Sequence, residues 1–169
     1  CGGAALDPDL VDRFDELGIQ IAQGYGITEC APLVSVNPYT NLKYGSLGVP
    51  IRGSSIKILR KNDDGSESEA ETGGIGEICV KGPQVMRGYW NRPEETAATL
   101  RDGWLRTGDI GNMDSNGRIT ITDRQKDMIL VSGFNVYPNE AEAGLQSMPE
   151  ILECGVVGVP SEKSGEMVK

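Results

Sequence analysis

A chain of 169 residues, 38% of them hydrophobic, is long enough for one ordinary domain or two small ones with a packed core. Its formal net charge of −9 argues against a nucleic-acid-binding surface, because neutralising phosphates requires clustered Lys and Arg that this sequence lacks. It contains no histidine, which excludes Ser-His and Cys-His catalysis and His-ligated zinc, so an acidic cytoplasmic enzyme of different chemistry is expected.

Glycine and cysteine usage narrow the expected fold class. The 23 glycines are about twice the average share and lack the strict period of collagen, so they predict many turns between short strands. The cysteines are too scattered for a zinc knuckle or a thioredoxin-like motif, and reduced, mostly buried thiols are expected: Cys1, Cys30, Cys79 and Cys154. No run is long and apolar enough for a membrane span. Both ends fall inside stretches that look structured, so we expect a fragment of a longer protein.

A helix and a strand are the first predicted elements. Asp7-Pro8-Asp9 provides a capping residue with proline in the first turn. Apolar side chains then recur at helical spacing up to Gly18: Leu10, Val11, Phe14 and Leu17. Residues 19–23 alternate like a strand. Residues 1–41 are therefore predicted to be the end of an α/β subdomain, the last strand-helix-strand unit of a larger parallel sheet whose partner strands are expected upstream.

A glycine-flanked loop follows this strand, at the end where open α/β sheets usually bind ligands. Gly24 and Gly26 let the backbone approach a ligand closely. Tyr25 offers a flat face for a base, Thr28 a hydroxyl for phosphate, and Glu29 a hard oxygen for magnesium. Taken alone, the same loop also fits a tight turn with a packed tyrosine.

Residues 42–122 change to short β-prone runs separated by glycine and polar turns, which is typical of a small β-barrel or sandwich. The clearest runs are Ser55–Leu59, Gly76–Val80 and Ile119–Ile121. The polar stretch 61–74 is predicted to be an exposed hairpin tip without a function. Pro93 can begin a short helix through Leu100, and Tyr89 and Trp90 are expected to pack their loop onto the barrel.

Asp109 ends a β-prone run, directly after a glycine. A carboxylate in this position can accept hydrogen bonds from both hydroxyls of a ribose, and charge-assisted bonds of this kind are strong and directional. An isolated Thr-Gly-Asp sequence is commonly only a turn.

The charged cluster 123–127 runs directly into a β-prone apolar run and a Gly-Phe-Asn turn, which indicates a joint between two architectures. Beyond it we predict a hairpin of residues 128–131 and 134–136, a helix over 139–148 and a strand over 154–159. The predicted fold class is therefore α/β and α+β. It comprises an α/β end (1–41), a small β-barrel subdomain (42–122), and a hinge with the start of a small α+β C-terminal domain (123–169).

Several stretches, in the correct order, resemble motifs of the adenylate-forming (AMP-binding) superfamily. Residues 123–140 resemble its hinge motif, and their sequence is most similar to the form of that motif in long-chain fatty acid–CoA ligases. Residues 25–29 resemble its Tyr-Gly-x-Thr-Glu motif, residues 87–96 its Gly-Tyr-x-Asn-x-Pro-Glu motif, and residues 164–169 its Gly-Glu-x-x-Lys strand. Ala143-Gly144 departs from the family, because relatives usually carry larger, helix-favouring residues there.

The resemblance implies roles for the residues of the first loop. Tyr25 would stack on adenine, Thr28 would contact the α-phosphate, and Glu29 would help to hold magnesium; Thr28 and Glu29 are the candidate catalytic residues. The small residues that match the wall of the family's adenine pocket are Gly2, Gly3 and Ala4.

Further roles follow for the second half of the chain. Asp109 would bind the ribose, and Arg124 would be its partner at the ribose or phosphate edge. Gly133 lies in the turn that would swing in to admit the pantetheine arm of coenzyme A.

The activity that the resemblance implies belongs to a parent enzyme. It would use ATP and Mg²⁺ to convert a carboxylic acid, expected to be a fatty acid, into an acyl-adenylate, and then transfer the acyl group to coenzyme A. The family's phosphate loop and C-terminal lysine are not in this sequence, so the fragment itself is expected to be inactive. No nucleic-acid partner and no integral membrane segment are expected, and peripheral membrane association is left open for the parent. A peptide-synthetase adenylation domain and a non-catalytic β-rich binding module are the alternatives.

Overall fold

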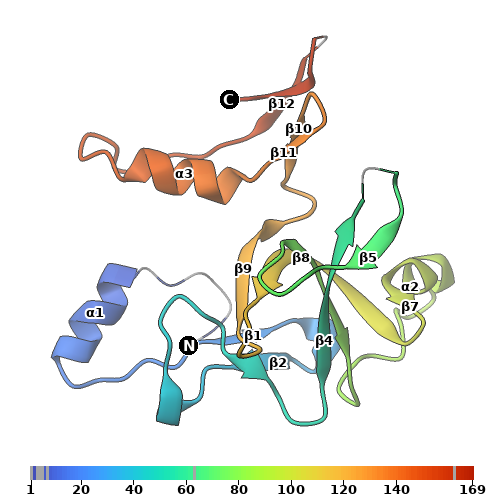
Figure 1. The fold of residues 1–169 in the computed structure, drawn as a ribbon, viewed down its shortest axis with the longest axis horizontal. Helices are drawn as coiled ribbons and strands as arrows, with labels where there is room; N and C mark the ends of the chain where they lie inside the picture. The colour runs from blue at the N-terminus through green and yellow to red at the C-terminus, as the bar shows by residue number, and fades with distance from the viewer. Residues whose placement is uncertain (1, 3–5, 7, 63, 162) are drawn as a thin grey trace. The chain divides into compact units, whose positions relative to one another are not determined.

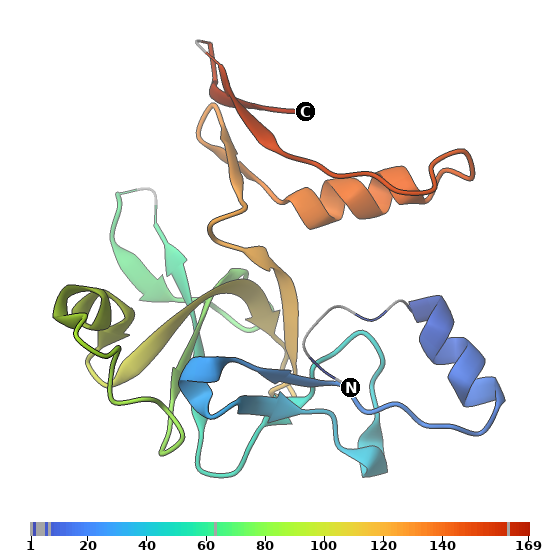
Figure 2. The ribbon, with the colours of Figure 1, turned by 180° about the vertical axis from the view of Figure 1, so that it is seen from behind.

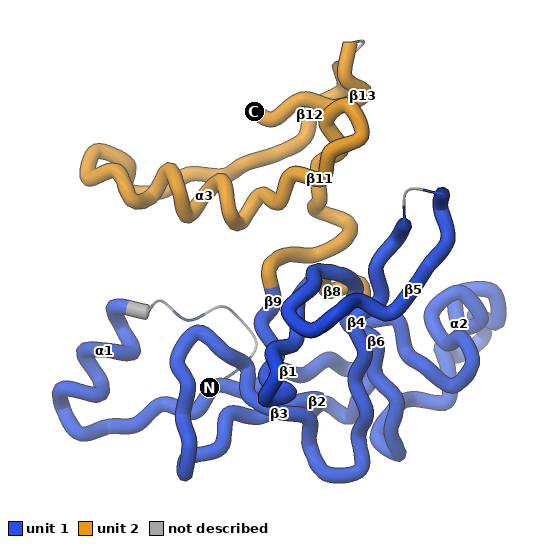
Figure 3. The backbone as a smooth tube through the Cα atoms, in the orientation of Figure 1, with its two compact units in different colours: residues 1–107, 111–121 blue, residues 108–110, 122–169 orange. Residues whose placement is uncertain are grey.

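The computed structural model describes residues 2, 6, 8–62, 64–161 and 163–169, so the predicted site residues Gly3 and Ala4 lie outside the described part of the chain. Figures 1 and 2 show the path of the chain from two sides. The chain forms two compact units, one of residues 1–107 and 111–121 and the other of residues 108–110 and 122–169 (Figure 3). Strands β8 and β9 contribute residues to both units.

The first unit begins with helix α1, Pro8–Glu16, which confirms the predicted helix. Val11 is buried on its inner face, and the helix ends where the amide of Gly18 donates to the carbonyl of Asp15 over 2.8 Å. The predicted strand over residues 19–23 is wrong, since the chain enters a strand only at Gly24. An alternating pattern forms a strand only where its backbone groups meet a neighbouring strand. Among the described residues, the antiparallel partner lies opposite the residues after Gln23.

A small sheet of three strands follows, in the order β1 (Gly24–Gly26), β2 (Leu33–Val36) and β3 (Val49–Pro50). Between β1 and β2 lies a short 3₁₀ helix, η1, at Thr28–Cys30. The register pairs Tyr25 with Ser35 and shifts at Gly26, where an added Cβ would overlap the carbonyl oxygen of Pro32. Both pairings of this small sheet, β1 with β2 and β2 with β3, are antiparallel. The larger parallel sheet to which residues 1–41 are assigned stays a prediction.

The larger sheet is an open half-barrel in which the strand order is β5-β4-β6-β8-β7, with β9 paired to β8. Its strands are β4 (Ser55–Lys61), β5 (Glu67–Glu69), β6 (Gly76–Lys81), β7 (Leu100–Arg101), β8 (Trp104–Met113) and β9 (Ile119–Arg124). Helix α2, Pro93–Thr99, connects β6 to β7. The three β-prone runs expected from the sequence became β4, β6 and β9. The polar stretch after β4 includes β5, which pairs back onto β4 as a hairpin.

One apolar core joins the two sheets of the first unit. Its buried members are Tyr25 and Val34 from the small sheet, Cys30 from η1, and Ile58, Ile78, Val80, Leu105 and Ile119 from the half-barrel. The thiols of Cys30, Cys79 and Cys154 are free, and the first two are fully buried. Burial raises the pKa of the Cys30 and Cys79 thiols to about 11, so both remain protonated at neutral pH.

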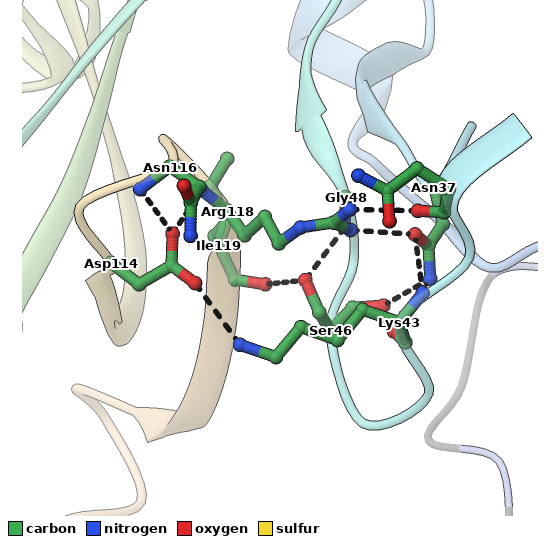
Figure 4. A network of polar contacts seen from close by, with 9 residues as sticks. Asn37, Lys43, Ser46, Gly48, Asp114, Asn116, Arg118 and Ile119 are labelled. Carbon is green, nitrogen blue, oxygen red and sulfur yellow. Dashed lines mark hydrogen bonds and ion pairs between the residues drawn. The ribbon is translucent and has the colours of Figure 1, made fainter.

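A buried polar network fixes the loop between β2 and β3 against the turn between β8 and β9 (Figure 4). The loop includes a second 3₁₀ helix, η2, at Tyr39–Asn41. The guanidinium of Arg118 donates to Oδ1 of Asn37 over 3.0 Å and to the carbonyl of Asn41 over 2.7 Å. The amide of Asn37 donates in turn to the carbonyls of Lys43 and Ser46. Asn37 is 1% exposed and Arg118 6% exposed, so water cannot replace these bonds.

We expect Asn37→Ala to lower the free energy of unfolding by about 3 kcal/mol, because it leaves buried donors and acceptors without partners. Asn62→Ala is the matched control, since the Asn62 side chain bonds to serine side chains at the β4–β5 turn outside the core, and its loss should cost less than about 0.5 kcal/mol. Urea denaturation of the three proteins measures both changes. Equal losses would contradict the structural role of the network.

The second unit contains a four-stranded antiparallel sheet, in the order β11-β10-β13-β12, and helix α3 at Pro138–Gln146. Its strands are β10 (Ile129–Val131), β11 (Phe134–Val136), β12 (Gly158–Ser161) and β13 (Gly165–Val168). The predicted hairpin is confirmed, with a turn in which Ser132 and Gly133 both have positive φ, as tight hairpins require. The predicted strand over 154–159 begins only at Gly158, because the amide of Val156 bonds to the Glu142 side chain of α3 instead of to a strand.

No helix in the described part of the chain is long and apolar enough to cross a membrane.

Candidate functional site

Strand β1 and helix η1 place most of the predicted first-loop residues next to one another in the first unit. Gly24, Tyr25 and Gly26 form β1, and Thr28 and Glu29 begin η1. A Cβ added to Gly2 would lie 2.9 Å from the carbonyl oxygen of Gly24, so the structure brings Gly2 against this segment. The close approach leaves space only for glycine at this point.

The side chains of the segment differ in exposure. Tyr25 is 6% exposed and packs in the core with Cys30 and Val34. Thr28 is exposed, and its hydroxyl has no hydrogen-bond partner among the residues that the structure describes. Stacking of Tyr25 on adenine and contact of Thr28 with phosphate stay predictions. Thr28 is the more accessible of the two.

Glu29 is held by a loop that lies sixty positions further along the chain. The hydroxyl of Tyr89 donates to Oε1 of Glu29 over 2.8 Å, and the amide of Met86 donates to the Glu29 carbonyl over 2.8 Å. Sequence reasoning missed this role of Tyr89, although the motif resemblance of residues 87–96 marked the loop. The expected packing of Trp90 on the barrel is wrong, because its side chain is 90% exposed.

Metal binding at Glu29 depends on the chemistry of the available donors. The described residues contain no group of three or more His, Cys, Asp or Glu side chains that could hold a metal ion. Magnesium does not need such a group, because it commonly binds through one or two carboxylates, several waters and the phosphates of a nucleotide. The single carboxylate of Glu29, one residue after the exposed Thr28, fits this mode of binding.

The second unit brings Asp109 and Arg124 together. Nε of Arg124 lies 3.4 Å from Oδ1 of Asp109, and their side chains are 61% and 8% exposed. The amide of Gln125 donates to the carbonyl of Gly108 over 2.8 Å, which keeps the two backbones adjacent. The structure thus brings the two predicted site residues together, and their roles at the ribose or phosphate edge stay predictions.

Asp123, the predicted hinge residue, is 3% exposed. Its Oδ1 accepts from the amide of Arg124 over 2.7 Å, and its Oδ2 accepts from the amide of Asn139 over 3.2 Å. Asn139 lies in the first turn of α3, whose own N-cap residue, Tyr137, makes no capping bond with its side chain. Asp123 therefore satisfies an amide at the start of α3. The sequence motif did not reveal this contact.

Gly133 lies at the tip of the β10–β11 hairpin, where no atom lies within 4 Å of an added Cβ. The neighbouring Phe134 is 76% exposed. An exposed glycine turn beside an exposed aromatic ring can approach a ligand closely. Its contact with coenzyme A stays a prediction.

Comparison with known proteins gives the same family from sequence and from structure. Residues 1–90 match the AMP-binding enzyme family. The chain is 50% identical over 171 residues to the long-chain-fatty-acid–CoA ligase of Escherichia coli O6:H1, with 99% of this chain and 30% of that protein covered. The chain thus spans about a third of the length of its curated relatives.

Two solved structures share the fold over 99% of the chain. ATP-bound MatB from Rhodopseudomonas palustris aligns with a TM-score of 0.89 at 37% identity, and the match covers 33% of that protein. The o-succinylbenzoate–CoA synthetase of Bacillus subtilis, in complex with ATP and a magnesium ion, aligns with a TM-score of 0.82 at 36% identity, covering 34% of its chain.

Proposed function

The chain belongs to the AMP-binding enzyme family, and from this premise we propose that it is part of a long-chain fatty acid–CoA ligase. The parent protein would act in the cytoplasm, activate a fatty acid with ATP as an acyl-adenylate, and transfer the acyl group to coenzyme A. The sequence identity to the fatty acid ligase supports the substrate class, and the ATP and magnesium complexes of the two structural relatives support the cofactors.

The observation that carries the proposal is the arrangement at η1. The Thr28 hydroxyl has no hydrogen-bond partner among the described residues, and the next residue, Glu29, accepts a hydrogen bond from the Tyr89 hydroxyl at one carboxylate oxygen. In this proposal Thr28 donates to a phosphate oxygen, and Glu29 would hold a magnesium ion, which would neutralise charge on the phosphates. The oxygen of the fatty acid carboxylate attacks the α-phosphate and pyrophosphate leaves, so these residues act mainly by positioning and charge stabilisation.

Replacing Asp109 tests the nucleotide site in the parent protein. We expect Asp109→Ala to weaken ATP binding by roughly 10- to 150-fold, because a hydrogen bond to a charged group contributes about 1.5–3 kcal/mol. Titration calorimetry measures the affinity, and thermal unfolding shows whether the variant keeps its fold. Asp64→Ala, at the exposed β4–β5 turn, is the control and should bind ATP as the wild type does. Unchanged affinity in Asp109→Ala would show that Asp109 is only a turn residue.

A peptide-synthetase adenylation domain is the second candidate function. The identity of 50% to a fatty acid–CoA ligase, which extends over 99% of the chain and so includes the hinge, favours a coenzyme A ligase instead. Measuring acyl transfer to free coenzyme A separates the two candidates, because an adenylation domain of a peptide synthetase transfers its product to a carrier protein instead.

A further inference from the structure

The loop between β6 and α2 is fastened to the turn that carries Glu29. The amide of Met86 donates to the Glu29 carbonyl over 2.8 Å, and the Met86 side chain packs against the apolar core of the first unit. Polar and apolar contacts therefore hold the same residue of the loop. Three positions later the loop presents Tyr89 to the Glu29 side chain.

The backbone of Tyr89 is fixed independently of its hydroxyl. Its amide donates to Oγ1 of Thr96 over 2.9 Å, and Oγ1 of Thr96 donates to the carbonyl of Arg92 over 2.7 Å. The amide of Arg92 completes the ring of bonds by donating to the Tyr89 carbonyl over 3.3 Å. The phenol thus projects from a backbone tied to the first turn of α2, so its hydroxyl meets Glu29 from a defined direction.

The bond between the two side chains engages only one carboxylate oxygen. Oε1 of Glu29 accepts from the Tyr89 hydroxyl at 2.8 Å, while Oε2 has no hydrogen-bond or ion-pair partner among the described residues. The Tyr89 phenol is the donor in this bond, and the Glu29 carboxylate is the acceptor. A carboxylate held in this way cannot rotate freely, and its second oxygen faces one direction.

We propose that Tyr89 is a positioning residue for Glu29, holding its carboxylate so that the free oxygen is directed at the divalent cation of the bound nucleotide. This inference rests on the proposed function, in which Glu29 is the protein ligand of that cation. A hydrogen bond that orients a metal-ligating carboxylate commonly contributes 10- to 100-fold to metal affinity, on the order of the effect expected here. Magnesium makes strict demands on ligand geometry, so the orientation of one carboxylate matters more than for calcium.

The test measures binding of Mn²⁺ to the parent protein in the presence of ATP, by the loss of the free Mn²⁺ signal in electron paramagnetic resonance. Tyr89→Phe should raise the Mn²⁺ dissociation constant by about 10-fold. The matched control is Tyr44→Phe, which removes a phenol that donates to Oδ1 of Asp15 over 3.0 Å. Tyr44 and Tyr89 are both 37% exposed, so general effects of losing a half-exposed phenol should be equal. Tyr44→Phe should bind Mn²⁺ as the wild type does.

Glu29→Gln and the double variant separate this inference from the proposed function. Glu29→Gln should weaken Mn²⁺ binding more than Tyr89→Phe, and adding Tyr89→Phe to it should have no further effect. Normal Mn²⁺ binding by Tyr89→Phe, with weakened binding by Glu29→Gln, overturns the positioning role and leaves the proposed function standing. Normal binding by Glu29→Gln overturns both. An additive loss in the double variant shows that Tyr89 acts elsewhere and also overturns the positioning role.

Activity gives an independent readout. Raising the Mg²⁺ concentration should restore the adenylation rate of Tyr89→Phe towards that of the wild type, because only the affinity for the ion is lowered. A loss of rate that saturating Mg²⁺ does not restore would point to misfolding and would overturn the positioning role.

Discussion

Gly48→Ala should lower the free energy of unfolding of the first unit by more than about 4 kcal/mol, enough to unfold a marginally stable domain. Gly48 has a φ of +80°, and a Cβ on it would overlap the carbonyl group of Val36 in strand β2. Its own carbonyl accepts from the amide of Ile119 over 2.9 Å, so the backbone is bonded to β9 as well and cannot withdraw. Relief of the clash requires separating strands that carry the core.

The matched control is Gly45→Ala, three positions earlier in the same loop. Gly45 has a φ of +75°, and no atom lies within 4 Å of a Cβ added there. It isolates the cost of a left-handed backbone for alanine, about 1–2 kcal/mol. Circular dichroism during urea denaturation measures both variants. Similar stabilities for the two would mean that the loop moves away from β2 at little cost.

Asp123→Pro in the parent enzyme should lower the rate of acyl transfer to coenzyme A by about 100-fold or more, while acyl-adenylate formation survives. The proposed hinge requires the backbone at Asp123 to adopt two conformations, and proline fixes φ near −65°. The Gly133 turn could then no longer move to admit the pantetheine arm. Single-turnover measurements of each half-reaction give the two rates.

Proline also removes the carboxylate that bonds to the amide of Asn139, which could weaken α3 for a different reason. Asp123→Ala is therefore the control, since it loses the same carboxylate and keeps a free backbone. The difference between the two variants isolates the backbone restriction. Equal loss in both half-reactions, no loss in either, or identical behaviour of the two variants would count against the hinge.

Local sequence signals predicted the elements whose structure depends on neighbouring residues. The Pro8 start and the helical spacing up to Leu17 gave α1, and the Ser132-Gly133 turn gave the β10–β11 hairpin. The strand expected over residues 19–23 failed, because a strand exists only where a partner lies opposite, and alternation does not specify a partner.

The contacts that shape the candidate site join residues far apart in the sequence, so local sequence patterns could not predict them. Glu29 and Tyr89 are 60 positions apart, and Asn37 and Arg118 are 81 positions apart. The residue types were visible, so the sequence identified Glu29 as a candidate ligand. Which partner would fix its carboxylate depended on how the loop after β6 packs, and nothing in the spacing of these residues encodes that packing.

Tyr25 and Cys30 belong both to the candidate site and to the apolar core of the first unit. Ligand binding at the site should therefore stabilise the folded unit. Tyr25 is paired with Ser35 of β2, and the carbonyl of Glu29 accepts from the amide of Met86, so residues outside this segment hold it in place. Because Tyr25 and Cys30 share one core with Ile58 and Ile78, we expect the amide hydrogens of the segment to exchange with solvent only when that core opens. A ligand that binds this segment should therefore raise the free energy of unfolding of the entire first unit. The increase is about 2.7 kcal/mol when the ligand concentration is 100 times its dissociation constant. Ligand binding at the site and folding of the first unit are in this way linked equilibria, so each stabilises the other.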